Sequence, residues 1–183
     1  MKPNRLNRFS LLCSLICYLI VCCPPTLTAQ QQPREVVRIL AVGNSFSDDG
    51  VEYLDELAKA AGIRLIVGNL YIGGCSLERH WENVSKGLPA YDYRKNCEGV
   101  QSNTPKTSLL SALQDEPWDY ITVQQVSQNS GLYDTYYPFM PSLLQYLRTH
   151  ATNPGVRFAI QQFWPYACDS NHSEFANYDN DQT

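Results

Sequence analysis

The fold of this chain is decided by Val36-Val37-Arg38-Ile39-Leu40-Ala41-Val42-Gly43-Asn44-Ser45-Phe46-Ser47. The first seven residues form a nearly continuous apolar run, which is typical of a strand buried on both faces of a sheet. A glycine and a short polar run follow at once, and residues 48–61 then repeat apolar side chains at helical spacing. The stretch predicts a strand that leads through a tight turn into a helix, with a serine hydroxyl at the carboxyl end of the strand.

The turn between this strand and the helix has two interpretations. Either Ser47 or Asp48 caps the N-terminus of the helix at 48–61. Or Ser45 is a nucleophile, and the oxyanion that its reaction forms lies beside the free N–H groups of the first helical turn. The helix is expected to end at Gly62. Its buried face is expected to consist of Val51, Leu54, Leu57, Ala58 and Ala61.

The alternation of strands and helices continues along the chain. Strands are predicted at 64–71, 118–123 and 156–163, and helices at 76–81, 106–114 and 136–150. Residues 89–105 are rich in Tyr, Asn and Gly and are predicted to be a loop or a small hairpin insertion, with Tyr91, Tyr93 and Val100 as pairing candidates. Strands that alternate with helices predict an α/β fold, with a parallel sheet, right-handed crossovers and helices on both faces.

The first 29 residues are predicted to be a signal peptide. A basic start, an apolar run at 9–21 and the small residues Thr28-Ala29 match the three parts of such a segment. The apolar run is short for a membrane span, which favours cleavage over a retained anchor. A lipid on Cys22 or Cys23 is a third alternative, which the bulky residues before them disfavour. We therefore expect a secreted or periplasmic protein without a stable membrane span.

Length and composition indicate one globular domain, at 36–183 after a polar linker at 30–35. The chain has 183 residues and a formal net charge of −4, with no basic stripe, so nucleic acid is not an expected partner. After cleavage three cysteines are left, an odd number that allows one disulfide and a free thiol: Cys75, Cys97 and Cys168. None of them has metal-ligand spacing, and the sequence contains no cofactor motif. It assigns no oligomeric state.

Three of the predicted strands end in small or amide residues. Ser45 follows the first strand, Gly74 follows the second, and Gln128-Asn129 follow the third. Because the carboxyl ends of parallel strands meet at one edge of a sheet, we expect these loops to form one crevice. Gln124 and Gln125, directly at the end of the third strand, are further candidates to point into it.

In this order, the three loops resemble the sequence blocks of the SGNH (GDSL-type) hydrolase superfamily. Gly43-Asn44-Ser45-Phe46 stands where Gly-Asp-Ser-Leu is usual, Gly74 matches the glycine of the second block, and Gln128 or Asn129 matches the asparagine of the third. The Gly-Asn-Ser-Phe-Ser opening further resembles a group of secreted bacterial SGNH-like proteins of unassigned function. The resemblance implies a three-layer α/β/α sandwich with a parallel, flavodoxin-like sheet.

The resemblance also implies a serine esterase that needs no cofactor. Ser45 would be the nucleophile, and the oxyanion would be stabilised by the backbone N–H groups of Ser45 and Gly74 and an amide of Gln128 or Asn129. Aromatic residues are dense in the predicted loops, which supports a glycan ester such as an O-acetylated sugar as substrate. The alternative is that most of these aromatics serve in core and rim packing, which leaves a small-molecule ester equally open.

The general base is the difficult part of this interpretation. Asp169-Ser170-Asn171-His172 has the form of the superfamily's Asp-x-x-His block, which makes Asp169 and His172 candidates for the base. It follows the fourth strand directly, however, whereas the superfamily's block follows a further helix and strand. His80 is expected at the surface or at the rim of the crevice, and His150 at a helix end. The simpler account is a chain that stops before its last strand, helix and His block, with an exposed sheet edge and poor stability.

Two other functions fit the sequence. A catalytically inactive glycan-binding or structural domain on the same fold is favoured by Asn44, by the loose third block and by the missing base. A phosphate- or nucleotide-binding flavodoxin-like module would hold an anion at the first loop and helix.

Overall fold

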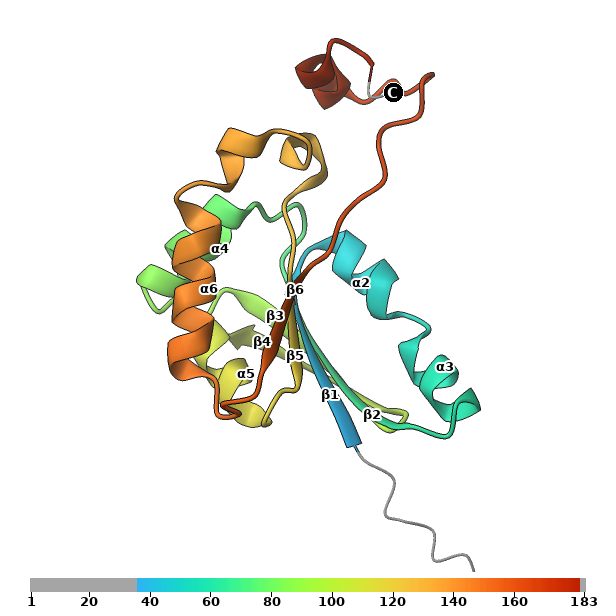
Figure 1. Ribbon diagram of the computed structural model, residues 1–183, viewed down its shortest axis with the longest axis vertical. Helices are drawn as coiled ribbons and strands as arrows, with labels where there is room; N and C mark the ends of the chain where they lie inside the picture. Colours follow the sequence, from blue (N-terminus) through green and yellow to red (C-terminus); the bar gives the residue numbers. More distant parts are fainter. Residues whose placement is uncertain (1–35, 182–183) are drawn as a thin grey trace, which may run out of the picture. The chain divides into compact units, whose positions relative to one another are not determined.

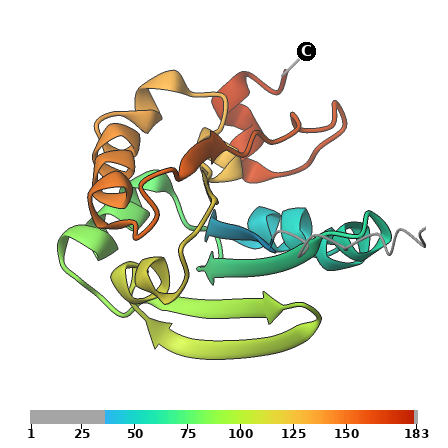
Figure 2. The same cartoon turned by 60° about the horizontal axis from the view of Figure 1, so that its bottom comes forward.

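The structure is a computed structural model that describes residues 36–181, so the predicted signal peptide and linker lie outside the described residues. Six strands form one sheet in the order β4-β3-β2-β1-β5-β6. They are β1 (Val36–Gly43), β2 (Arg64–Tyr71), β3 (Tyr91–Cys97), β4 (Val100–Thr107), β5 (Tyr120–Val123) and β6 (Arg157–Ile160). The strands β2, β1, β5 and β6 are parallel, and β3 and β4 form an antiparallel hairpin at the β2 edge (Figure 2).

Helices cover both faces of this sheet. They are α2 (Ser45–Val51), α3 (Leu54–Ala60), α4 (Leu77–Ser85), α5 (Leu109–Asp115) and α6 (Phe139–His150), with 3₁₀ turns η1 (Ser127–Asn129), η2 (Tyr133–Tyr136) and η3 (Ser173–Tyr178). Figure 1 shows α2 and α3 on one face and α4, α5 and α6 on the other. The predicted α/β/α sandwich is confirmed, and its parallel strands follow the flavodoxin-like order 2-1-3-4.

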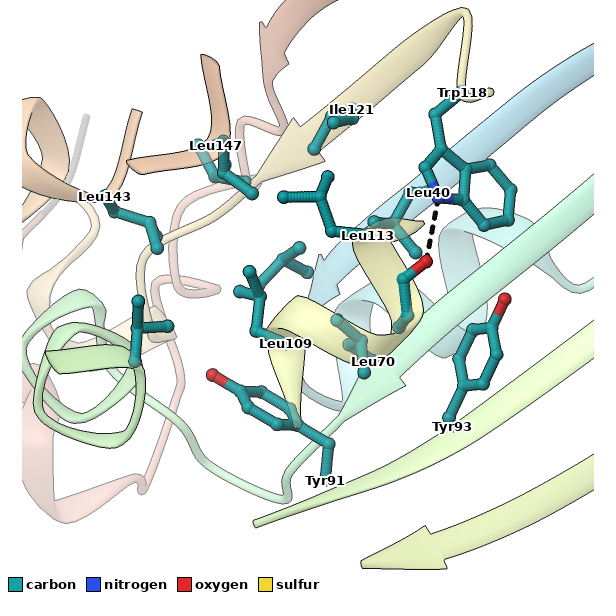
Figure 3. Packing of buried hydrophobic residues seen from close by; sticks show 14 of the residues in the cluster. Leu40, Leu70, Tyr91, Tyr93, Leu109, Leu113, Trp118, Ile121, Leu143 and Leu147 are labelled. Atoms are coloured by element: carbon teal, nitrogen blue, oxygen red, sulfur yellow. Dashed lines mark hydrogen bonds between the residues drawn. The ribbon is translucent and has the colours of Figure 1, made fainter. Parts of the chain in front are cut away.

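The main hydrophobic core lies between the sheet and the layer of α4, α5 and α6. Leu40, Leu70 and Ile121 of the sheet are fully buried against Leu113 and Leu147 of the helices (Figure 3). The indole of Trp118 packs into the same cluster, and its N–H donates a 2.9 Å hydrogen bond to the carbonyl of Ala112. The face under α2 and α3 has a much smaller cluster, centred on Ala58, Leu65 and Val67.

The predicted helix at 48–61 is wrong as a single element. The helix begins earlier, at Ser45, and a break at Glu52-Tyr53 divides it into α2 and α3. Because a new helix starts at Leu54, the apolar face that was predicted from Val51 onward does not continue as one face. Ala58 faces the sheet, whereas Leu57 is 63% exposed and Ala61 is also exposed.

The region 89–105 is a hairpin rather than a loop. Tyr93 pairs with Thr104 and Cys97 pairs with Val100, so the hairpin alternative is confirmed. β4 extends to Thr107, which delays the next helix from the predicted 106 to Leu109.

The remaining elements are of the predicted type but begin or end at different residues. The strand predicted at 156–163 is observed as β6 only over Arg157–Ile160, because its partner β5 ends at Val123. β5 itself begins at Tyr120 rather than at 118, and α4 runs past Trp81 to Ser85. The helix predicted at 136–150 begins at Phe139, after the separate turn η2.

The three cysteines of the domain are all free thiols. Cys75 is buried, and burial raises its thiol pKa to about 12. Within residues 36–181, no helix combines the length and apolar character that a membrane span requires. Over the same residues, no three His, Cys, Asp or Glu side chains cluster in a way that could hold a metal ion.

Candidate functional site

The N-cap of α2 is Asn44, in the turn after β1, and not Ser47 or Asp48 as the sequence suggested. The side-chain oxygen of Asn44 accepts a 3.1 Å hydrogen bond from the N–H of Phe46, so α2 begins one residue after the strand-end asparagine. Ser45 becomes the first residue of α2 and is exposed. Within residues 36–181 its hydroxyl has no hydrogen-bond partner.

The side chain of Asn44 joins three strand ends. Its Nδ2 donates to the carbonyl of Cys75 at 3.1 Å, in the loop after β2. Its Oδ1 accepts a hydrogen bond from Nε2 of Gln124, at the end of β5. A backbone bond from Ile72 to the carbonyl of Gly43, at 3.2 Å, also ties the first loop to the second. The loops that carry Ser45 and Gly74 are therefore neighbours.

Glycine is required in each of these loops for a different reason. At Gly43, a Cβ atom would lie 2.7 Å from the side chains of Gln124 and Ser47, so no larger residue fits. Gly74 has a left-handed φ of +58°, which other residues adopt only with strain. A Cβ at position 74 would meet nothing within 4 Å, so the space beside Gly74 is open.

The loop after β5 buries a different pair of amides from the pair that the superfamily block suggests. Gln124 and Gln125 are each only 1% exposed. The Oε1 of Gln125 accepts the N–H groups of Leu77, at 3.0 Å, and of Val126, at 2.9 Å. Gln124 continues the strand directly, and its Oε1 has no partner among residues 36–181.

Gln128 and Asn129 lie in η1 and are partly exposed. The carbonyl of Gln128 accepts a hydrogen bond from the hydroxyl of Tyr178, at 3.1 Å, which holds the C-terminal turn η3 against this loop. The side chain of Gln128 contacts Ser127, whose hydroxyl lies 3.3 Å from its Oε1. Both residues are thus in the loop that the sequence indicated, next to η3.

A polar network that is buried at Ser47 and Asn69 and partly exposed at Asp48 and Arg94 was not predicted. The hydroxyl of Ser47 lies 2.8 Å from Oδ1 of Asn69, and Nδ2 of Asn69 donates to Asp48 at 2.5 Å. Asp48 forms an ion pair with Arg94, whose guanidinium lies 3.8 Å above the ring of Tyr71. The network fixes α2 to β2 and β3. The one signal in the sequence was a polar Asn69 inside an apolar strand.

The end of β6 also reaches the Ser45 turn. Nε2 of Gln161 donates to the carbonyl of Phe46 at 2.8 Å. The ring of Phe46 lies 4.5 Å from that of Phe163 and 5.2 Å from that of Trp164, measured between centroids. Trp164 remains 67% exposed, so an open aromatic surface lies beside Phe46, the residue that follows Ser45.

None of the described histidines is hydrogen-bonded to Ser45. His80 is fully buried rather than at the surface, because the inner face of α4 also carries Leu77 and Val84. Its Nδ1 lies 3.0 Å from the hydroxyl of Tyr91, and burial lowers its pKa to about 3. His150 ends α6, as predicted, with Nδ1 at 2.9 Å from the carbonyl of Tyr146.

His172 and Asp169 are both exposed in the segment after β6. Nδ1 of His172 accepts the N–H of Glu174 at 3.2 Å, which makes His172 the N-cap of η3. In the neutral ring the proton is then on Nε2, and no nitrogen is left to accept the proton of a serine. This arrangement disfavours His172 as the base.

Comparison with known proteins identifies the family. A family model described as "Domain of unknown function (DUF4886)" matches residues 38–183. The chain belongs to the DUF4886 family. The crystal structure of a DUF4886 family protein from Bacteroides uniformis ATCC 8492 is 47% identical in sequence, with a TM-score of 0.78. The match covers 81% of the present chain and 57% of the Bacteroides chain, so this chain spans little more than half of that relative.

A second structure is more distant from this DUF4886 domain. It is described as "a putative SGNH hydrolase from Slackia heliotrinireducens", with 23% identity and a TM-score of 0.48 over 79% of this chain and 65% of that one. No curated protein matches the chain.

The DUF4886 site offers a limited set of chemical groups. It has an exposed hydroxyl at Ser45, backbone N–H groups at Ser45 and Gly74, and amides in the loop after β5. Hydroxyl and N–H groups in this arrangement suit a nucleophilic attack on a carbonyl and the stabilisation of the resulting oxyanion.

Proposed function

We propose that this DUF4886 domain is a serine ester hydrolase of the SGNH type, with Ser45 as the nucleophile. The observation that carries the proposal is the set of hydrogen bonds around Asn44, which gathers the loops after β1, β2 and β5 at one point. Ser45 follows Asn44 directly and presents its hydroxyl to solvent at that point. Ligands of open α/β sheets bind at this edge, outside the carboxyl ends of the strands.

The proposed reaction has two steps. The Ser45 oxygen attacks the ester carbonyl carbon while its proton passes to a base, and the C–O bond to the alcohol then breaks, with the alcohol leaving in protonated form. Water next attacks the acyl group on Ser45 and releases the acid and the free hydroxyl. In each step the oxyanion would be held by the N–H groups of Ser45 and Gly74, with a Gln128 or Asn129 amide as a third donor. The loss of one such donor typically slows a reaction about 10²–10³-fold.

The surroundings of Ser45 support an ester on a sugar, such as an O-acetyl group. The exposed ring of Trp164 packs in an edge contact with Phe46, the residue that follows the proposed nucleophile. A flat aromatic surface with one free face suits the apolar face of a sugar ring. A small polar acyl group would fit the open space beside Gly74.

Labelling with a fluorophosphonate tests the proposal, because this reagent reacts with a serine only when the serine is activated. We expect the full-length wild-type protein to be labelled, and the Ser45→Ala protein to be unlabelled. Ser85→Ala, which removes an exposed hydroxyl at the end of α4, serves as the control and should be labelled like wild type. Absence of labelling in the wild type, or equal labelling of Ser45→Ala, would contradict the proposal.

One observation favours a second function: no described histidine is hydrogen-bonded to Ser45. A domain that binds glycans without hydrolysing them would need no base. In that case the protein would bind sugar ligands with the same affinity after Ser45→Ala, and neither protein would react with the fluorophosphonate.

A further inference from the structure

A cavity of about 400 Å³ lies along α2, on the face of the sheet opposite the main core. Its floor is formed by the strands β2, β3 and β4. The pairing of Val67 with Asn96, and of Asn96 with Gln101, places these three side chains in one row across the sheet. Its wall is formed by Asp49 of α2 and by Glu52, the C-cap residue of that helix. The volume is in the range of small-molecule sites.

The cations around this cavity are already paired. The guanidinium of Arg94 is bound to Asp48. The ammonium of Lys95 is bound to Asp115, at 2.7 Å, and to Glu116, at 2.6 Å. No positive charge of these residues is therefore left to attract an anionic ligand.

The carboxylates and amides around the cavity have fewer ion-pair and hydrogen-bond partners than the cations have. Asp49 and Glu52 are exposed, and within residues 36–181 neither carboxylate has an ion-pair partner. Gln101 is also exposed, and its amide makes no hydrogen bond within the same residues. Carboxylates accept hydrogen bonds from hydroxyl groups, and amides both donate and accept them. This set of groups suits an uncharged ligand with many hydroxyls and repels an anion.

The cavity begins next to the nucleophile. Asp48 and Asp49 follow Ser45 by three and four residues, so the three side chains lie on the same side of α2. At about 1.5 Å of rise per residue, Asp49 is about 6 Å and Glu52 about 10 Å along the helix from Ser45. A ligand the size of one or two sugar rings would thus extend from Ser45 into the cavity.

We propose that this cavity binds the sugar unit whose ester group is presented to Ser45, and that the bound sugar is uncharged. The inference rests on the proposed function, since it names the substrate that the Ser45 site would act on. Hydroxyls of the ring would bond to the carboxylates of Asp49 and Glu52, to the amide of Gln101, and to Nδ2 of Asn96, whose Oδ1 already accepts the N–H of Gly99 at 2.7 Å. Sugars that carry a carboxylate would be excluded by the unpaired negative charge of the wall.

Binding is measured apart from catalysis, with the full-length Ser45→Ala protein. The probes are three neutral tetrasaccharides (cellotetraose, xylotetraose and mannotetraose) and, for comparison, tetragalacturonate. We expect at least one neutral probe to shift the NMR signals of Asn96, Gln101 and Glu52, and tetragalacturonate to bind at least about tenfold more weakly.

Variants of the cavity floor identify the site. When Asn96→Ala and Gln101→Ala are introduced together into the Ser45→Ala protein, binding of the neutral probe should weaken about tenfold, because two hydrogen-bonding amides are lost. The control is Gln114→Ala, an exposed amide on α5 at the opposite face, which should leave the affinity unchanged.

Three results would overturn the inference: no binding of any neutral probe, signal shifts confined to residues outside the cavity, or equal affinity for tetragalacturonate. Failure of the proposed function has a different signature, because it appears as absent labelling of Ser45 by the fluorophosphonate in the wild-type protein. Labelling is measured on the wild-type protein and sugar binding on the Ser45→Ala protein, so the failure of one proposal can be distinguished from the failure of the other.

Discussion

The side-chain oxygen of Asn44 accepts a hydrogen bond from Nε2 of Gln124, eighty positions later in the chain. Both side chains are 1% exposed. The same Asn44 oxygen caps α2 at Phe46, and the Asn44 amide group reaches the loop after β2. One buried side chain thus determines how three strand ends meet, and Ser45 is presented at that junction.

Asn44→Ala should destabilise the domain by about 3 kcal/mol, because it removes a helix cap and leaves the Gln124 amide and the Cys75 carbonyl without a partner. Urea unfolding of the two proteins measures the difference. Gln114→Ala, an exposed amide that touches no part of the site, should change stability by less than about 0.5 kcal/mol. A loss at Asn44 no larger than this control would show that Asn44 does not hold the loops together.

Gly74→Ala should reduce fluorophosphonate labelling at least about tenfold, because alanine keeps the proposed oxyanion donor N–H but places a Cβ in the open space beside it, where the oxyanion would lie. Gly87→Ala is a matched control. Gly87 has a φ of +62° against +58° for Gly74, and a Cβ at either position meets nothing within 4 Å. Both substitutions should cost about 1 kcal/mol of stability from backbone strain alone. Equal labelling of the two variants would argue against a role for Gly74 in the site.

His80 should make the stability of the domain depend on pH. Burial, with a smaller contribution from Arg79, lowers the pKa of His80 from 6.5 to about 3. The unfolded chain therefore takes up this proton well before the folded protein does. The contribution of His80 to the free energy of unfolding is fully present above pH 6.5. It falls by about 1.4 kcal/mol per pH unit as the pH decreases toward 3.

Urea unfolding between about pH 4 and pH 6 measures this slope. The neighbours Cys75 and Tyr91 do not interfere, because burial raises the pKa of both groups far above this range. His80→Phe removes the titrating ring and should flatten the profile, although Tyr91 loses its partner. A profile with the same slope in His80→Phe would mean that other groups cause the pH dependence.

His172→Ala should leave labelling of Ser45 within about threefold of wild type, since Nδ1 of His172 accepts the N–H of Glu174 and the neutral ring has no free acceptor. The loss of this N-cap should cost about 1 kcal/mol locally, visible as faster hydrogen exchange in η3. Loss of labelling as complete as in Ser45→Ala, with the protein still folded, would instead identify His172 as the base.

Much of the fold was readable from the sequence because its signals are local. The apolar run before Gly43 predicted β1, and the turn chemistry after it predicted the helix. Periodicity and composition located the remaining elements to within a few residues, apart from the division into α2 and α3 and the short β6. Those two errors share a cause, because a helix break and the length of a strand depend on packing partners rather than on spacing along one segment.

The sequence by itself determined the alternation of strands and helices, and the positions of Ser45 and Gly74 at the ends of the first two strands. These features follow from hydrophobic periodicity and from the small side chains of turns. Only the tertiary structure decided that Asn44 caps α2, that His80 is buried, and that Gln124 reaches back to the first loop. Each of these depends on partners that folding brings together across the sheet, and the spacing of residues within one segment contains no information about them.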